Sequence, residues 1–152
     1  MKSLSVTLKK IECLQTNETG KDELFVQVHA KEEVKGGIDL ITTCPKNQKG
    51  YWSIKKGDVI EFDEILFVDK INHGIQVKCT FIEEDVTGLL VHKAIQELID
   101  DYIGEINIFV NQNGEKQINE GKNTKLKEKI GNDYIFSMMG SGAHYIVTIH
   151  IK

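Results

Sequence analysis

The chain has 152 residues, a mass of 17.2 kDa and a formal net charge of −4 at pH 7. A hydrophobic fraction of 40% and a single proline are typical of a globular protein and exclude extended disorder, so we expect one domain spanning residues 1–152. All 19 basic side chains are lysines. Without arginine the chain lacks the side chain that grips phosphates and guanine edges, and we predict no nucleic-acid partner. A genome that favours lysine codons would explain the same bias.

The three cysteines, Cys13, Cys44 and Cys79, have no short spacing between them. They indicate neither a disulfide framework nor a zinc site, and we expect reduced, mostly buried thiols. The N-terminal residues lack the apolar core of a secretory signal, and no apolar run approaches the length of a membrane span. The expected location is the cytoplasm, or outside the cell by a route without a visible signal peptide.

Alternating apolar residues, separated by turn signals, run through most of the chain. The first segment shifts its alternation near Lys9 and Lys10, which predicts one long strand with a bulge. Pro45 should end a strand, because proline cannot donate to a ladder. The expected strands cover 4–15, 24–28, 38–44, 51–54, 59–68, 75–82, 105–110, 134–138 and 143–151. The pattern is typical of an all-β, antiparallel β-sandwich of about eight strands.

Two segments depart from this alternation. Residues 87–99 carry apolar side chains at helical spacing after Thr87, a candidate N-cap, and predict one short inserted helix. Its apolar face either plugs an open end of the sandwich or, through Leu89, Leu90 and Val91, contacts a protein partner or a membrane. Residues 116–132 are polar and rich in lysine, and we expect an exposed loop there.

The motifs of catalysis are missing from the sequence. No Gly-x-Ser-x-Gly elbow, HExxH pair or phosphate-binding loop is present, and the five histidines are scattered. We therefore predict that the protein is not an enzyme. Tyr51 and Trp52 form an aromatic pair that could line a sugar-binding groove, although such a pair also packs well in a core.

Acidic residues gather at strand ends. Glu18, Asp22, Glu23, Glu83, Glu84, Asp85, Glu97, Asp100 and Asp101 lie in segments that could converge. Calcium takes six to eight oxygen ligands, and converging carboxylates would supply them. The alternative is that these acids are solvated turn residues.

The chain resembles a C2 domain, the β-sandwich family known for calcium-dependent phospholipid binding. The resemblance rests on an acid-opened strand, Asp22-Glu23-Leu24-Phe25-Val26, on Glu83-Glu84-Asp85, and on Asp101-Tyr102-Ile103-Gly104-Glu105. It implies calcium ligands at Asp22, Glu83, Asp85 and Asp101, with Glu18, Glu84 and Asp100 as additional candidates. Thr16 stands where the family has its first loop aspartate, and Glu23 replaces the usual proline.

Three functions follow as expectations. The first is a non-enzymatic binding module that meets a phospholipid surface or a protein partner, with calcium as its cofactor. The second is a calcium-independent interaction module or a structural subunit of a larger assembly, which uses sheet edges or the 87–99 helix. The third is a small carbohydrate-binding module built on Tyr51 and Trp52.

Overall fold

The computed structural model describes residues 2–16, 20–83 and 102–152. These residues form eleven strands and no helix. The strands are β1 (Lys2–Gln15), β2 (Lys21–Glu32), β3 (Asp39–Cys44), β4 (Trp52–Lys55), β5 (Val59–Ile71), β6 (Ile75–Glu83), β7 (Tyr102–Val110), β8 (Lys116–Glu120), β9 (Thr124–Ile130), β10 (Asp133–Gly140) and β11 (Ala143–Ile151). The all-β prediction is confirmed, and the estimate of about eight strands was too low.

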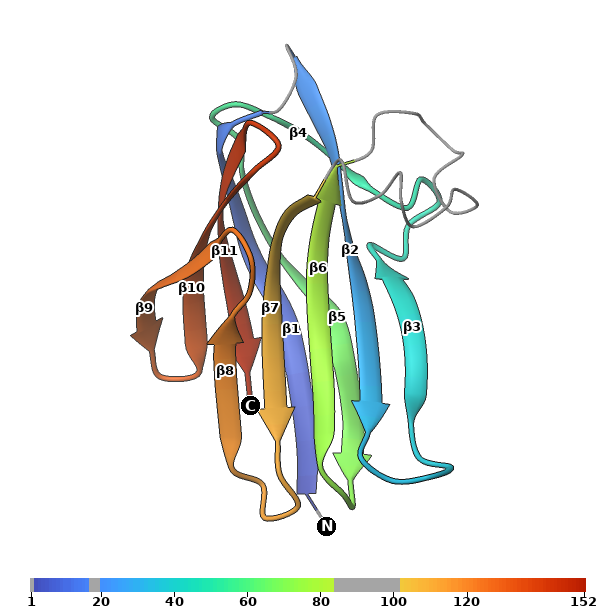
Figure 1. Cartoon of the computed structure of the whole chain (residues 1–152). Helices are drawn as coiled ribbons and strands as arrows, with labels where there is room; N and C mark the ends of the chain where they lie inside the picture. Colours follow the sequence, from blue (N-terminus) through green and yellow to red (C-terminus); the bar gives the residue numbers. More distant parts are fainter. Residues whose placement is uncertain (1, 17–19, 84–101) are drawn as a thin grey trace.

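The strands form two antiparallel sheets that face each other in a sandwich-like arrangement (Figure 1). The five-stranded sheet has the order β5-β1-β11-β10-β9. The other has the order β3-β2-β6-β7-β8, and β4 pairs with the opening residues of β2. On one side of the molecule, β3 and β4 therefore lie at the edge of one sheet and β5 at the edge of the other.

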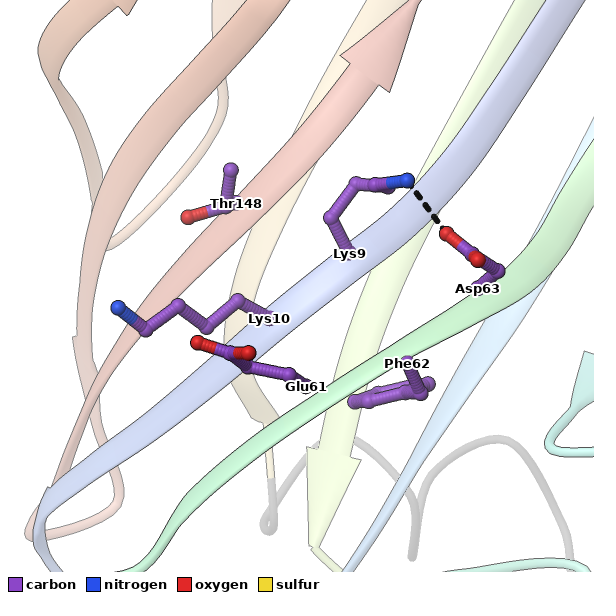
Figure 2. Close-up of a pocket in the computed structure, with 6 residues that line it drawn as sticks. All are labelled: Lys9, Lys10, Glu61, Phe62, Asp63 and Thr148. Carbon is purple, nitrogen blue, oxygen red and sulfur yellow. Dashed lines mark hydrogen bonds and ion pairs between the residues drawn. The ribbon is translucent and has the colours of Figure 1, made fainter.

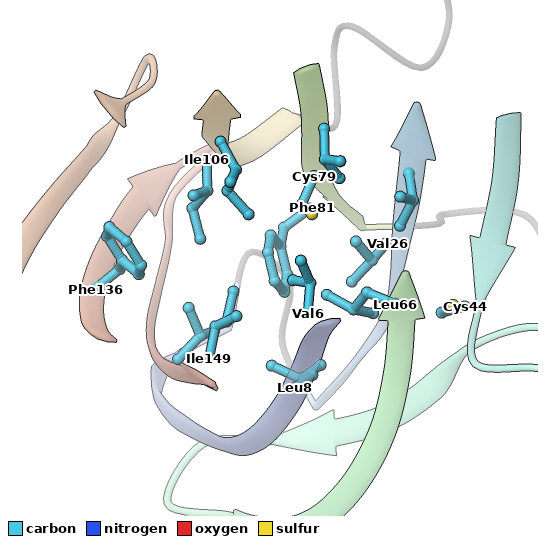
Figure 3. Packing of buried hydrophobic residues seen from close by; sticks show 14 of the residues in the cluster. Val6, Leu8, Val26, Cys44, Leu66, Cys79, Phe81, Ile106, Phe136 and Ile149 are labelled. Carbon is cyan, nitrogen blue, oxygen red and sulfur yellow. The ribbon is translucent and has the colours of Figure 1, made fainter. Parts of the chain in front are cut away.

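One hydrophobic core fills the space between the sheets. Alternate residues of β1, among them Val6 and Leu8, meet Val26 of β2 and Phe81 of β6 (Figure 3). Each of these side chains is fully buried or almost so. Because successive side chains of a strand point to opposite faces, the alternation read from the sequence translates directly into this shared core.

The bulge predicted in the first strand is confirmed. The pairing of β1 with β11 shifts register between Leu8 and Lys10, and Lys9 is the extra residue of this ladder. The ladder with β5 shifts at the same place, but there the additional residue lies on β5, between Glu61 and Glu64. The core face thereby passes from Leu8 to Ile11 without burying a lysine. A bulge also bends the strand and increases its local twist, so that one long strand can follow the curvature of the sheet.

The expectation of an exposed loop over residues 116–132 was wrong. The segment forms β8 and β9, two strands that lie at the edges of different sheets. Every residue of β9 except Thr124 is exposed, so the strand has no continuous buried face to generate an alternating sequence. The lysine-rich sequence of β9 predicts a loop because the strand is formed by backbone pairing with β10, which leaves no pattern in the side chains.

The predicted helix at 87–99, with Leu89, Leu90 and Val91, lies outside the described residues. Within the part of the chain that is described, no helix is long and apolar enough to cross a membrane.

Candidate functional site

Two of the predicted calcium ligands, Asp22 and Glu83, lie at the same end of the six-stranded sheet. Leu24 of β2 is the register partner of Glu83 on β6, and Asp22 precedes Leu24 by two residues. Both carboxylates therefore belong to the core-facing side of the sheet, as diagonal neighbours. Each has 0% relative exposure. The sequence predicted both at strand ends, as calcium ligands or as solvated turn residues, whereas the fold turns both inward.

Asp22 accepts a hydrogen bond from the hydroxyl of Tyr145 on β11, at 2.5 Å between Oδ2 and the phenolic oxygen. This bond joins the two sheets. Burial and the Asp22 carboxylate raise the pKa of Tyr145 far above its usual range, so its hydroxyl stays a proton donor. Cys13, the register partner of Tyr145, is buried beside it, and this burial raises the pKa of its thiol. The polar cluster Asp22–Tyr145–Cys13 is a structural link between sheets.

The remaining predicted site residues lie outside the described part of the chain. These are the calcium candidates Glu18, Glu84, Asp85, Asp100 and Asp101 and the partner-binding candidates Leu89, Leu90 and Val91. Among residues 2–16, 20–83 and 102–152, no three histidine, cysteine or acidic side chains are grouped closely enough to hold a metal ion. Calcium binding stays a prediction of the sequence.

The aromatic pair Tyr51 and Trp52 lines a surface groove of about 490 Å³. Trp52 pairs with Leu24 and so sits on the core-facing side of β4, but at the sheet edge, where it is half-buried. The groove is lined by Asn47, Gln48, Lys49, Tyr51, Trp52, Ser53 and Ile60. The two rings therefore contact buried residues on one side and line a groove on the other.

The loop before Tyr51 is shaped by Asn47. Its side-chain oxygen accepts a hydrogen bond from Gly50 N at 2.6 Å, and its amide donates to the carbonyl of Tyr51 at 3.3 Å. Gly50 has a φ of +79°, which a side chain would disfavour. The turn holds Gln48 and Lys49, both exposed, at the rim of the groove.

A second groove of about 460 Å³ lies on the outer side of the five-stranded sheet (Figure 2). It is lined by Lys9, Lys10, Glu61, Phe62, Asp63 and Thr148. The bulged Lys9 reaches Asp63, with 2.5 Å between Nζ and Oδ1, and this contact raises the pKa of Lys9. Lys10 is the register partner of Glu61. The groove thus presents alternating positive and negative groups around one aromatic ring.

Trp52 and Phe62 connect the two grooves. Their ring centroids are 5.2 Å apart with a tilt of 52°, the geometry of a favourable aromatic pair. Trp52 lines the first groove and Phe62 lines the second. We define the Trp52–Phe62 side as these two grooves together. Tyr51 and Trp52 were predicted from the sequence as an aromatic pair. Phe62, Lys9 and Asp63 were not, because only the pairing of β1 with β5 brings them to this side.

No family model matches this chain, and neither a curated protein nor a solved structure is similar enough to it to count as a match. The resemblance to C2 domains therefore stays a prediction from the sequence motifs, and the geometry of the chain itself must carry any functional proposal.

Proposed function

We propose that the protein is a non-enzymatic binding module that takes a carbohydrate on its Trp52–Phe62 side. The observation that carries this proposal is the pair of adjoining grooves, each with an aromatic ring and a rim of amide, hydroxyl or charged groups. Volumes of about 490 and about 460 Å³ fall within the range of small-molecule sites.

The chemistry of a sugar suits these linings. A pyranose ring has C–H faces that pack on aromatic rings and a periphery of hydroxyl groups that both donate and accept hydrogen bonds. Amides such as Gln48 offer a donor and an acceptor, while carboxylates accept and lysines donate. The Trp52–Phe62 side supplies all of these groups around three aromatic rings, those of Tyr51, Trp52 and Phe62.

Two grooves that meet at one aromatic pair favour an oligosaccharide over a single sugar. One ring of the ligand would pack against Tyr51 and Trp52, and a neighbouring ring would reach Phe62 between the Lys9–Asp63 and Lys10–Glu61 pairs. The grooves lie open on the surface beside paired strands, so a ligand can reach them in the conformation that the structure has.

We retain the C2-like β-sandwich as the proposed fold family. Two antiparallel sheets with a common core support it. Calcium-dependent contact with phospholipid or a protein partner has weaker support. Asp22 and Glu83 share one face of the β2–β6 pair, but both are fully buried there, and Asp22 already accepts a hydrogen bond from Tyr145.

A screen of immobilised glycans tests the carbohydrate proposal, with neutral, acidic and amino-sugar oligosaccharides as probes. Phe62→Ala should weaken binding at least tenfold, because it removes the ring between the grooves. Phe109→Ala is the matched control, since Phe109 is a partly exposed aromatic residue on β7 in the other sheet. Binding to no probe, or equal losses from the two substitutions, would contradict the proposal.

A further inference from the structure

The five-stranded sheet ends in two long edge strands, β5 and β9. In the part of the chain that the structure describes, β5 pairs only with β1 and β9 only with β10. The outer edge of each strand therefore presents backbone donors and acceptors that can pair with another strand, and on β5 the Ile65 carbonyl already accepts a long hydrogen bond from Cys44 Sγ at 3.8 Å. Residues Ile60–Asp63 of β5 line the proposed sugar grooves, but an interface at the remaining edge does not depend on sugar binding.

The two edges carry opposite charge. Strand β5 holds Glu61, Asp63, Glu64 and Asp69 against one lysine, a net charge of −3. Strand β9 holds Lys125, Lys127 and Lys129 against one glutamate, a net charge of +2. Nearby lysines reduce the field of β5, since Lys9 pairs with Asp63 and Lys46 lines the same side. Within the Glu64–Lys70 half of β5, Glu64 and Asp69 stand against Lys70, so this half carries a net charge of −1 in its own strand, opposite in sign to the +2 of β9.

This charge pattern selects among the possible edge contacts. Two β9 edges would bring lysines together, and two β5 edges would bring carboxylates together, and like charges opposite each other in a sheet are destabilising. A β9 edge against a β5 edge joins opposite charges. The lysines that protect β9 from its own copy therefore make it complementary to the other edge of the same sheet.

Apolar residues on the two strands match as well. Ile65 and Val68 of β5 are 51% and 60% exposed, and by register they lie on the outer face of the sheet. Ile130 of β9 is 58% exposed on the corresponding face. Leu126, opposite the buried Phe136, lies on the core-facing side.

Beside β5 is a groove that could receive a core-facing apolar side chain. It has a volume of about 140 Å³, and its lining includes Val28, Ala30, Leu40, Leu66 and Phe67. A strand added to β5 would direct its core-facing residue toward this groove. Leu126 of β9 is a partly exposed apolar side chain on the core-facing side, and an incoming β9 would offer it to this groove.

We propose that the chain associates head to tail with a second copy of itself, by pairing β9 of one copy with the Glu64–Lys70 half of β5 of the next. The contact joins two different surfaces, so each added copy leaves one free β5 edge and one free β9 edge. Such an interface builds open chains unless its rotation closes a ring. Residues Val59–Asp63, which contribute to the sugar grooves, stay outside the paired half.

Light scattering of the full chain across a concentration series tests the contact. At about 0.01 M salt, where the screening length is about 30 Å, we expect the average mass to rise with concentration above the 17.2 kDa of one chain. At about 1 M salt, with screening over about 3 Å, the apparent association constant should fall at least tenfold. A mass of one chain at all concentrations, or association that salt leaves unchanged, would overturn the proposal.

Charge-reversed variants identify the edges. Lys125→Glu with Lys127→Glu should abolish association, and so should Glu64→Lys with Asp69→Lys, because each gives both edges of a chain the same sign. Mixing the two variant proteins should restore association in an alternating chain. Circular dichroism checks that each variant folds. If Lys125→Glu with Lys127→Glu does not fold, the milder pair Lys125→Gln with Lys127→Gln takes its place. Variants that fold and still associate alone, or a mixture that stays monomeric, would refute the β5–β9 contact.

Discussion

Replacing Tyr145 with phenylalanine removes one buried oxygen atom from between the two sheets and tests the link that it makes. The lost group is the hydroxyl that donates to Asp22 Oδ2 at 2.5 Å, in a pair whose carboxylate is 0% exposed. A hydrogen bond to a charged, buried group contributes about 1.5–3 kcal/mol to stability. The carboxylate has lost its water on folding, and without the tyrosine hydroxyl it has one hydrogen bond fewer to replace that water. Tyr145→Phe should lower the free energy of unfolding by that amount.

For a chain of this length, about 1 kcal/mol shifts the melting temperature by roughly 2–4 °C, so we expect a drop of about 3–12 °C. Urea unfolding followed by circular dichroism gives the free energy directly. Tyr134→Phe is the matched control, because Tyr134 is also buried in the core but its contacts with Phe136 and the Lys129 ammonium are made by the ring and not by the hydroxyl. Removal of its hydroxyl should therefore cost less stability than Tyr145→Phe does.

A double-mutant cycle with Asp22→Asn separates the bond from packing. In the Asp22→Asn background the tyrosine hydroxyl meets a neutral partner, so Tyr145→Phe should cost less than in the native chain, with a coupling energy of about 0.5–3 kcal/mol. Additive losses, or a Tyr145→Phe protein as stable as the native one, would refute the assigned role of this contact.

Three further outcomes are expected. Burial raises the pKa of the Cys79 thiol from 9.0 to about 12. The stability that this thiol contributes is therefore complete below about pH 9 and is lost as the pH rises toward 12. The urea concentration at the midpoint of unfolding should fall over this pH range, and it should fall less in Cys79→Ala. Gly140→Ala should cost about 1–3 kcal/mol in urea unfolding, because a Cβ there would lie 2.5 Å from the Ile103 carbonyl oxygen, and no loss would contradict the close packing of β7 and β10. Calcium bound by Asp22, Glu83, Asp85 and Asp101 would raise the melting temperature by binding the folded state, and an unchanged value at millimolar calcium would contradict the calcium prediction.

The sequence predicted those strands whose two faces differ. In β1, β6, β10 and β11, buried side chains mostly alternate with half-buried ones, and the approximate positions of these strands followed from that pattern. Strands β8 and β9 escaped prediction because edge strands exposed on both faces need no apolar alternation. Their order is specified by backbone pairing with distant partners, which leaves little local signal.

The inward direction of Asp22 was available in the sequence but was not used. Asp22, Leu24, Val26 and Val28 occupy alternate positions of one strand, so a core face that contains the three apolar residues also contains the aspartate. What the sequence could not supply was the partner. Tyr145 lies 123 residues further along the chain and on the other sheet.

The Trp52–Phe62 side was predicted only in part. Tyr51 and Trp52 are adjacent in sequence and drew attention as an aromatic pair. Phe62, Lys9 and Asp63 join them only because β5 returns beside the bulged strand β1. The Trp52–Phe62 side combines residues from a loop, the short strand β4 and the neighbouring strands β1 and β5, so no local sequence pattern predicts it.

Trp52 is the only tryptophan of the chain, so its indole N–H gives a single, assigned signal in a ¹⁵N-labelled sample. Titration with the oligosaccharide selected from the glycan screen should move this signal saturably, and Phe62→Ala should weaken the response at least tenfold while Phe109→Ala leaves it unchanged. An oligosaccharide that binds the protein without moving the Trp52 indole signal would contradict the proposed binding side.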